Sequence, residues 1–141
     1  MASTDPLLGT SPRPVRLLVE AGKVAEFRAA TGMAPDLDAT HAPPTFPVVL
    51  EHAGPSYASV LSDQGIDLAH VLHGSETLRY PTGPLRVGDD LTGEMSVVGD
   101  ETKQGSAGPL RLVTLRAELR RLDGEVAVVV DRVLAVVTPP A

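Results

Sequence analysis

Residues 71–80 read Val-Leu-His-Gly-Ser-Glu-Thr-Leu-Arg-Tyr, and residues 84–89 read Pro-Leu-Arg-Val-Gly-Asp. The first stretch opens at a turn, His73-Gly74, and continues as a strand that ends at a Pro/Gly corner. The second stretch leads into the next strand. The chain before these stretches is mixed and rich in proline, and the chain after them is almost wholly strand-like. They therefore mark the change from helical structure to sheet.

The second half of the chain predicts four strands, the first of which continues the opening stretch. Apolar and polar side chains alternate over 91–97 and again over 113–120, which is typical of strands with one buried face. Residues 99–109 are polar and Gly-rich and predict a loop. Asp123-Gly124 predicts a two-residue hairpin turn. Residues 126–137 are largely β-branched, which predicts a central strand covered on both faces.

The first half predicts a tail and short helices. Residues 1–14 contain three prolines and small polar residues, and predict a flexible tail ahead of a single domain over 15–141. Helices are predicted over 20–31 and 56–64, on either side of a proline-rich, irregular segment over 33–47. Helices followed by antiparallel strands indicate the α+β fold class.

Composition and charge exclude several function classes. The 141 residues carry a net charge of −6, which argues against nucleic acid as a partner. There is no cysteine, so disulfides and thiolate chemistry are excluded. No apolar run approaches the roughly 20 residues of a membrane span, and residues 1–14 do not resemble a signal peptide. We therefore expect a soluble, cytoplasmic protein without membrane partners. Because one strand is apolar on both faces of a small sheet, we also expect a dimer.

Histidines and carboxylates are the candidates for chemistry. The four histidines, His41, His52, His70 and His73, lack the spacing of a metal site, so neither metal nor cofactor is expected. Asp36 and His41 lie five residues apart in an irregular segment and could form an acid/base dyad. A solvated turn explains the same pattern.

Two further features have both a functional and a structural interpretation. His73-Gly74 could admit a substrate carbonyl close to main chain that glycine leaves open, or could be a tight turn. Five arginines gather in the last third of the acidic chain. They could cover a solvated sheet face or could dock an acidic partner such as an acyl carrier protein. They are Arg111, Arg116, Arg120, Arg121 and Arg132.

The order of these motifs resembles the N-terminal, MaoC-like dehydratase domain of the hot-dog superfamily. That domain also occurs as a separate subunit of mycobacterial-type (3R)-hydroxyacyl-acyl-carrier-protein dehydratases. The resemblance covers about residues 15–137. It implies a hot-dog fold, in which a curved antiparallel sheet wraps around a helix and pairs with a second hot-dog domain. The motifs that carry it are the helix ending at Thr31-Gly32, the Ala-Pro-Pro-Thr-Phe-Pro segment 42–47, residues 71–76, residues 84–89 and Asp123-Gly124.

The resemblance also implies an activity, the reversible dehydration of a 3-hydroxyacyl thioester by an Asp and a His. Asp36 and His41 copy the spacing of the family signature Asp-x-Asn-Pro-(aliphatic)-His, but the residues between them differ. His41 also leads directly into Pro43-Pro44, without the helical segment that the family places there. The family's His-Gly-Glu-Gln motif is altered to His-Gly-Ser-Glu at 73–76, which puts in doubt any polar role of its last two positions.

The resemblance therefore implies a non-catalytic subunit that shapes an acyl tunnel in fatty-acid or polyketide synthesis. A partner hot-dog subunit would supply the catalytic dyad, and acyl-CoA or acyl carrier protein would carry the substrate. The expected tunnel residues are Pro43, Pro44, Thr45, Phe46, Tyr57, Val60, Leu61, His73 and Gly74.

Two other interpretations stay open. The chain could be a self-sufficient homodimeric dehydratase or thioesterase. A dehydratase would use Asp36 and His41, and a thioesterase would need a helical carboxylate, either Glu51 or, less suitably, Asp63. Alternatively, the chain could be a binding or assembly module for an acyl carrier protein.

Overall fold

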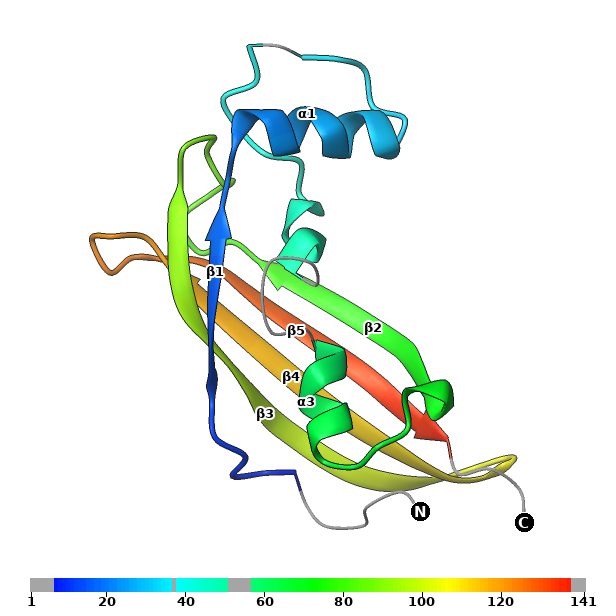
Figure 1. Ribbon diagram of the computed structural model, residues 1–141. Coiled ribbons are helices and arrows are strands. Elements are labelled where there is room, and N and C mark those ends of the chain that lie inside the picture. Colours follow the sequence, from blue (N-terminus) through cyan, green and yellow to red (C-terminus); the bar gives the residue numbers. More distant parts are fainter. Residues whose placement is uncertain (1–6, 37, 51–56, 138–141) are drawn as a thin grey trace.

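The computed structural model describes residues 7–36, 38–50 and 57–137. It contains one five-stranded antiparallel sheet in the order β1-β3-β4-β5-β2. The sheet is strongly twisted, α3 lies against one face, and α1 crosses beyond the end of β1 (Figure 1). The strands are β1 (Arg13–Leu18), β2 (Val71–Arg79), β3 (Asp90–Gly105), β4 (Gly108–Arg120) and β5 (Val126–Val137). The helices are α1 (Ala21–Ala30), η1 (Phe46–Val49), α3 (Tyr57–Asp63) and η2 (Leu68–His70).

The core lies between α3 and the face of the sheet that we call the inner face. Alternate residues of β4 from Val113 to Leu119 are fully buried on this face. Arg132 of β5 pairs in register with Leu115 of β4, and its guanidinium lies against Tyr57 of α3. The inner face is therefore the face that α3 covers, and the opposite side is the outer face.

The predicted strand over 126–137 is confirmed as a central strand. It is β5, with β4 on one side and β2 on the other. The consecutive residues Ala127–Val130 are all buried, so both faces of the strand are covered at that end. Burial of both faces explains why residues 126–137 are largely β-branched and do not alternate between apolar and polar side chains.

The prediction of a loop over 99–109 was wrong. Strands β3 and β4 continue through it as a long hairpin, paired as far as Gly105 and Gly108. Residues 101–104 are polar because both faces of the hairpin are exposed there. The Asp123-Gly124 turn is present, but it is a three-residue loop in which Gly124 has a φ of 88° and the Arg121 N–H bonds to the Glu125 carbonyl at 2.9 Å.

The prediction of a flexible tail over 1–14 was wrong for its described part. Arg13 and Pro14 begin β1, which pairs with β3 from Arg13 opposite Met95 to Leu18 opposite Asp90. Pro14 is compatible with this strand because β1 lies at an edge of the sheet. Leu7 is buried, and its N–H donates to Asp100 Oδ2 at 2.7 Å.

The helix predicted over 20–31 is confirmed as α1. Its end is set by Gly32, which has a φ of 73°. The Gly32 N–H bonds to the Ala29 carbonyl at 3.3 Å, and the Met33 N–H bonds to the Arg28 carbonyl at 2.9 Å. These two bonds satisfy carbonyls that the last helical turn leaves without partners.

Residues 84–89 join distant parts of the chain through hydrogen bonds, and we call this segment the clamp. Asp89 accepts hydrogen bonds from the Arg86 N–H at 2.9 Å and from Arg121 Nε at 3.2 Å. The main chain of Gly88 and Asp89 is bonded to Val19, at the end of β1. Burial acts to raise the pKa of Asp89, but the hydrogen bonds and positive charges of Arg121 and Arg86 outweigh it and hold the pKa below its ordinary value.

Gly93 allows the main chains of β3 and β4 to approach closely where the two strands pair. Its replacement therefore tests the described sheet. A Cβ at this position would lie 1.8 Å from the Glu118 carbonyl oxygen. We expect Gly93→Ala to lower the free energy of unfolding by about 3 kcal/mol, because main chain would have to move. Gly22 in α1 is the control, since its Cβ would meet nothing within 4 Å. Thermal unfolding of both variants checks this, and a Gly93→Ala protein as stable as Gly22→Ala would contradict the described sheet.

Candidate functional site

The structure places Asp36 and His41 on an exposed segment and engages each with its own neighbours. Asp36 Oδ1 accepts from the Asp38 N–H at 3.2 Å, and Thr40 Oγ1 lies 3.0 Å from His41 Nδ1. The main chain of His41 forms a β-bridge with Arg86. Within the described ranges, no hydrogen bond or ion pair joins Asp36 to His41. The acid/base dyad is therefore not assembled here.

The proline-rich segment before η1 is attached to the end of β2. Pro43 and Phe46 are buried, whereas Pro44 and Thr45 are exposed. The Tyr80 hydroxyl donates to the Pro44 carbonyl. Burial, together with the negative charge of Glu76, raises the pKa of Tyr80 to about 12, so this hydroxyl keeps its proton at neutral pH.

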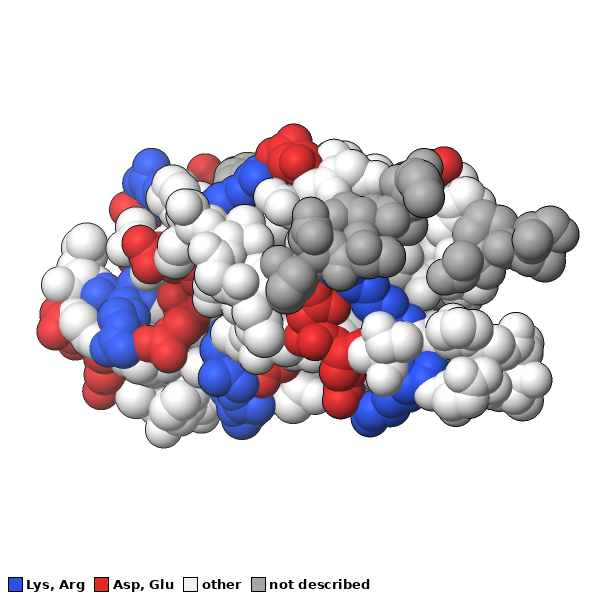
Figure 2. Space-filling model, turned by 90° about the horizontal axis from the view of Figure 1, so that it is seen from below, with Lys and Arg blue, Asp and Glu red and all other residues white. Residues whose placement is uncertain are grey.

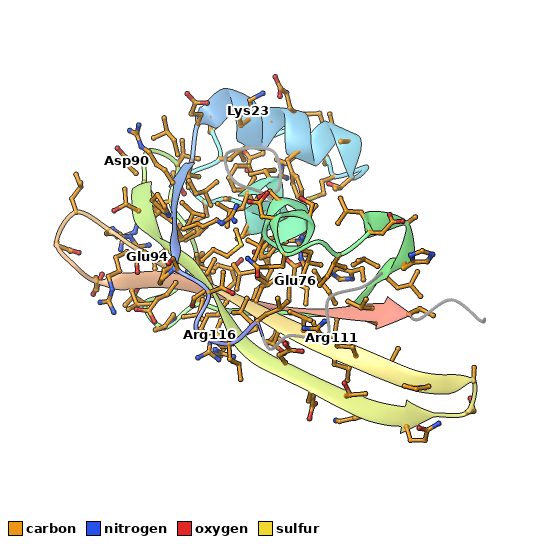
Figure 3. All side chains as sticks on the ribbon, turned by 60° about the horizontal axis from the view of Figure 1, so that its bottom comes forward. Lys23, Glu76, Asp90, Glu94, Arg111 and Arg116 are labelled. Carbon is orange, nitrogen blue, oxygen red and sulfur yellow. The ribbon has the colours of Figure 1, made fainter. Side chains whose placement is uncertain are left out.

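Phe46 faces a hollow that is separate from α3. The hollow has a volume of about 550 Å³ and lies between α1, the end of β1 and η1, where Leu17, Phe27 and Val49 also line it. Three of its charged lining residues form ion pairs: Arg16 bonds to Asp90 at 2.7 Å, and Lys23 bonds to Glu26 at 3.0 Å. Lys23 and Asp90 lie at this end of the molecule, while Glu76 lies near the middle (Figure 3).

The remaining expected tunnel residues lie elsewhere. Tyr57, Val60 and Leu61 form the buried side of α3 and belong to the core. His73 is half-exposed on β2, with a side-chain exposure of 52%. Gly74 marks a register shift in β2, and a Cβ there would lie 2.9 Å from the Val133 carbonyl oxygen. Gly74 therefore has a structural reason to be glycine, namely the close approach of β2 to β5.

A polar group that sequence reasoning did not bring together lies at the centre of the inner face. Glu76 Oε2 accepts from Arg132 Nε at 3.0 Å and from Arg132 Nη2 at 2.7 Å. The Arg132 Cζ atom lies 3.9 Å from the centroid of the Tyr57 ring. His73 Nε2 lies 3.3 Å from the same Glu76 oxygen. We call these residues, Tyr57, His73, Glu76 and Arg132, the inner-face cluster.

The sequence held one signal for this cluster. Arg132 shares the alternation of Val128, Val130 and Leu134, which all point to the inner face. The structure also explains the altered His-Gly-Ser-Glu motif at 73–76. Its last residue, Glu76, is the register partner of Arg132, whereas its third residue, Ser75, is exposed. The fourth motif position therefore has a polar role, as the carboxylate that neutralises Arg132.

The five arginines do not form a single basic patch. Arg132 is buried on the inner face and Arg121 is bonded to the clamp, so only part of the group reaches the outer face. Acidic and basic side chains are interspersed on the face that Figure 2 shows. Each arginine contacts a carboxylate: Arg111 with Asp100, Arg116 with Asp131, Arg120 with Glu118, Arg121 with Asp89 and Arg132 with Glu76.

Metal and membrane features can be assessed for the described part of the chain only. In those ranges no three His, Asp or Glu side chains gather as a metal site would require. No helix there is long and apolar enough to cross a membrane. Asp63 bonds to Arg13 at 2.6 Å, while Glu51 and His52 lie outside the described residues.

The Glu76–Arg132 pair gives a stability test of the inner-face cluster. We expect Arg132→Met to lower the free energy of unfolding by about 3 kcal/mol, because it leaves a largely buried carboxylate, 16% exposed, without its partner. The double variant Glu76→Leu/Arg132→Met removes both charges, so most of that loss should return. Denaturant unfolding of the single and double variants measures the difference. Additive losses in the double variant would show that the two side chains do not interact.

Solved structures with similar folds include two complexes of Mycobacterium tuberculosis. One is a C-terminally truncated HadBC complex, titled a 3R-hydroxyacyl-ACP dehydratase, with a TM-score of 0.69 and 17% identity over 94% of this chain and 99% of that one. The other is the ChsH1-ChsH2 complex, with a TM-score of 0.65 and 14% identity over 94% and 85% of the two chains. A MaoC-like dehydratase from Rhodospirillum rubrum matches with a TM-score of 0.52 and 18% identity, over 100% of this chain and 99% of its own.

Sequence comparison identifies the family. A UPF0336 protein of Clavibacter michiganensis subsp. michiganensis is 35% identical over 144 residues, which cover 89% of this chain and 88% of that protein. The family described as the FAS1-like dehydratase domain region matches residues 7–130. The chain therefore belongs to the FAS1-like dehydratase domain family, and its fold is the hot-dog fold of the MaoC-like dehydratases.

Proposed function

We propose that this chain is the non-catalytic subunit of an (R)-specific 3-hydroxyacyl-thioester dehydratase that consists of two hot-dog chains. One observation carries the proposal: Asp36 and His41, which alone copy the spacing of the family signature, are exposed and bonded to their own neighbours. A catalytic acid and base must reach the reacting atoms of the substrate in a common site. The partner chain would therefore supply the dyad.

The edge strand β2 supports pairing with a second hot-dog chain. It lies at the end of the sheet order, and residues 72–75 are exposed on it. An open strand edge offers unpaired main-chain donors and acceptors to another chain. Two structurally similar proteins are titled as complexes, HadBC and ChsH1-ChsH2, and this agrees with the proposed assembly.

The substrate class follows from the family and belongs to the proposal. It is a 3-hydroxyacyl thioester carried by CoA or acyl carrier protein, in fatty-acid or polyketide synthesis in the cytoplasm. HadBC is titled a 3R-hydroxyacyl-ACP dehydratase. A similar chain from A. caviae is titled an (R)-hydratase involved in PHA biosynthesis, with a TM-score of 0.54 and 21% identity over 94% of this chain and 98% of that one.

The two alternatives have less support. A role as a docking module for acyl carrier protein rested on the five arginines, and each of them contacts a carboxylate. A self-sufficient dehydratase needs the Asp36–His41 dyad. The thioesterase interpretation relied on Glu51, which lies outside the described residues, and on Asp63, which is paired with Arg13.

Hydration of crotonyl-CoA tests the proposal. We expect no activity from the purified chain alone, and activity when it is co-expressed with a hot-dog chain that carries the intact Asp-x-Asn-Pro-x-His signature. In that complex, Asp36→Asn and His41→Ala should change kcat by no more than about twofold, as surface substitutions do. Variants of the partner's signature Asp or His should abolish activity.

The contrary result is equally specific. Hydratase activity in the lone chain that either Asp36→Asn or His41→Ala removes would assign the chemistry to this chain. Capture of acyl carrier protein without any activity in the co-expressed complex would favour the docking module.

A further inference from the structure

The hollow between α1, the end of β1 and η1 has the size and the lining of a small-molecule site. Its volume of about 550 Å³ falls within the roughly 300–1,000 Å³ that is typical of such sites. Leu17 and Phe46 line it and are fully buried. Phe27 of α1 lies edge-on to Phe46, with ring centroids 5.7 Å apart and planes at 81°. An apolar, partly aromatic wall is therefore already in place.

The hollow stays open because α1 has few large side chains on the side that faces it. Val24 is buried and Phe27 is half-buried, whereas Ala30, which lines the hollow, is exposed. Leu18 of β1 also lines it and is 41% exposed. Covering apolar surface of this kind removes it from water, which is favourable. The hollow therefore favours a ligand with an apolar body.

Carboxylates outnumber cations around the hollow. Arg16 donates from Nε and Nη2 to the two carboxylate oxygens of Asp90, at 2.8 and 2.7 Å. Lys23 Nζ lies 3.0 Å from Glu26 Oε2. Glu20 lines the hollow and is exposed, and among the described residues its side chain bonds to no main-chain N–H at the start of α1. Three carboxylates thus share two cations.

The Lys23 ammonium already serves two of these carboxylates. Its hydrogen bond to Glu26 and the charge of Glu26 raise the pKa of Lys23, and the charge of Glu20 adds to both effects. In the described part of the chain, Glu20 therefore has no cation of its own. The faces of aromatic rings such as Phe27 and Phe46 also attract positive charge. Both features favour a ligand with a positive head group.

We propose that this hollow binds a small amphiphilic cation, in which an apolar or aromatic body carries a protonated amine. The body packs against Leu17, Phe27 and Phe46, and the ammonium group pairs with Glu20 at the rim. The inference does not rest on the function proposed above, because it concerns binding alone and involves no residue to which a part in dehydration is assigned.

The test is an NMR titration of the full-length chain with three ligands that share one apolar body, namely phenylbutylammonium, phenylbutanol and phenylbutyrate. We expect the ammonium to bind with a Kd of about 1 mM or below, as a ligand of roughly eleven non-hydrogen atoms allows. It should bind about fivefold more tightly than the alcohol, because only the ammonium pairs with Glu20 and with the ring faces. The butyrate should bind most weakly. Saturable shifts should centre on Phe27, Phe46 and Val49, which line the hollow.

Three variants separate the charge from the space. Glu20→Gln keeps the apolar wall and should reduce the affinity for the ammonium to that for the alcohol. Ala30→Phe fills the hollow and should weaken binding of all three ligands by about tenfold or more. Glu94→Gln is the matched control, because Glu94 is an exposed glutamate on β3 that does not line the hollow, and its affinities should equal those of the wild type.

The opposite results are as clear. Butyrate that binds as tightly as the ammonium, or a preference for the ammonium that survives in Glu20→Gln, would overturn the proposal. So would the absence of saturable shifts at Phe27 and Phe46 in the wild type. Glu20→Gln changes an exposed side chain only, so the test does not depend on whether Ala30→Phe folds.

Discussion

The buried guanidinium of Arg132 is the group on which the arrangement of the inner face depends. A charge in this position is stable only when it is paired, and among the described residues Arg132 has partners on two other elements. Glu76 supplies the carboxylate from β2, and Tyr57 supplies the ring from α3. Because β5, β2 and α3 meet at these three side chains, one ion pair fixes the edge strand and the helix on the same part of the sheet. It also makes the centre of the inner face polar and filled.

Much of the fold could be predicted from residues 71–89, because their roles are local and act on the main chain. Gly74 lies where a Cβ would approach the Val133 carbonyl oxygen, and Gly88 has a φ of 96°. Asp89 holds the turn through the Arg86 N–H and through Arg121. Constraints of this kind appear directly as residue types at fixed spacing, so the order of these motifs carries the resemblance that implies the hot-dog fold.

The rest depends on partners that are distant in the sequence. The long hairpin of β3 and β4 is polar over 101–104, so its composition predicted a loop, although pairing across the hairpin makes it sheet. The prolines in residues 1–14 predicted a flexible tail and no strand, although the end of this segment begins β1, which is hydrogen-bonded to β3. The residues that contact one another in the candidate site were equally hard to predict from the sequence. Asp36 and His41 are close in sequence but are held by their own neighbours, whereas Glu76 and Arg132 are 56 residues apart and meet across two strands.

The most direct measurement is a crystal structure of the two-chain complex with an enoyl thioester bound. The account predicts that the reacting carbons contact an Asp and a His of the other chain. A structure in which Asp36 and His41 come within hydrogen-bond reach of the reacting carbons would contradict it.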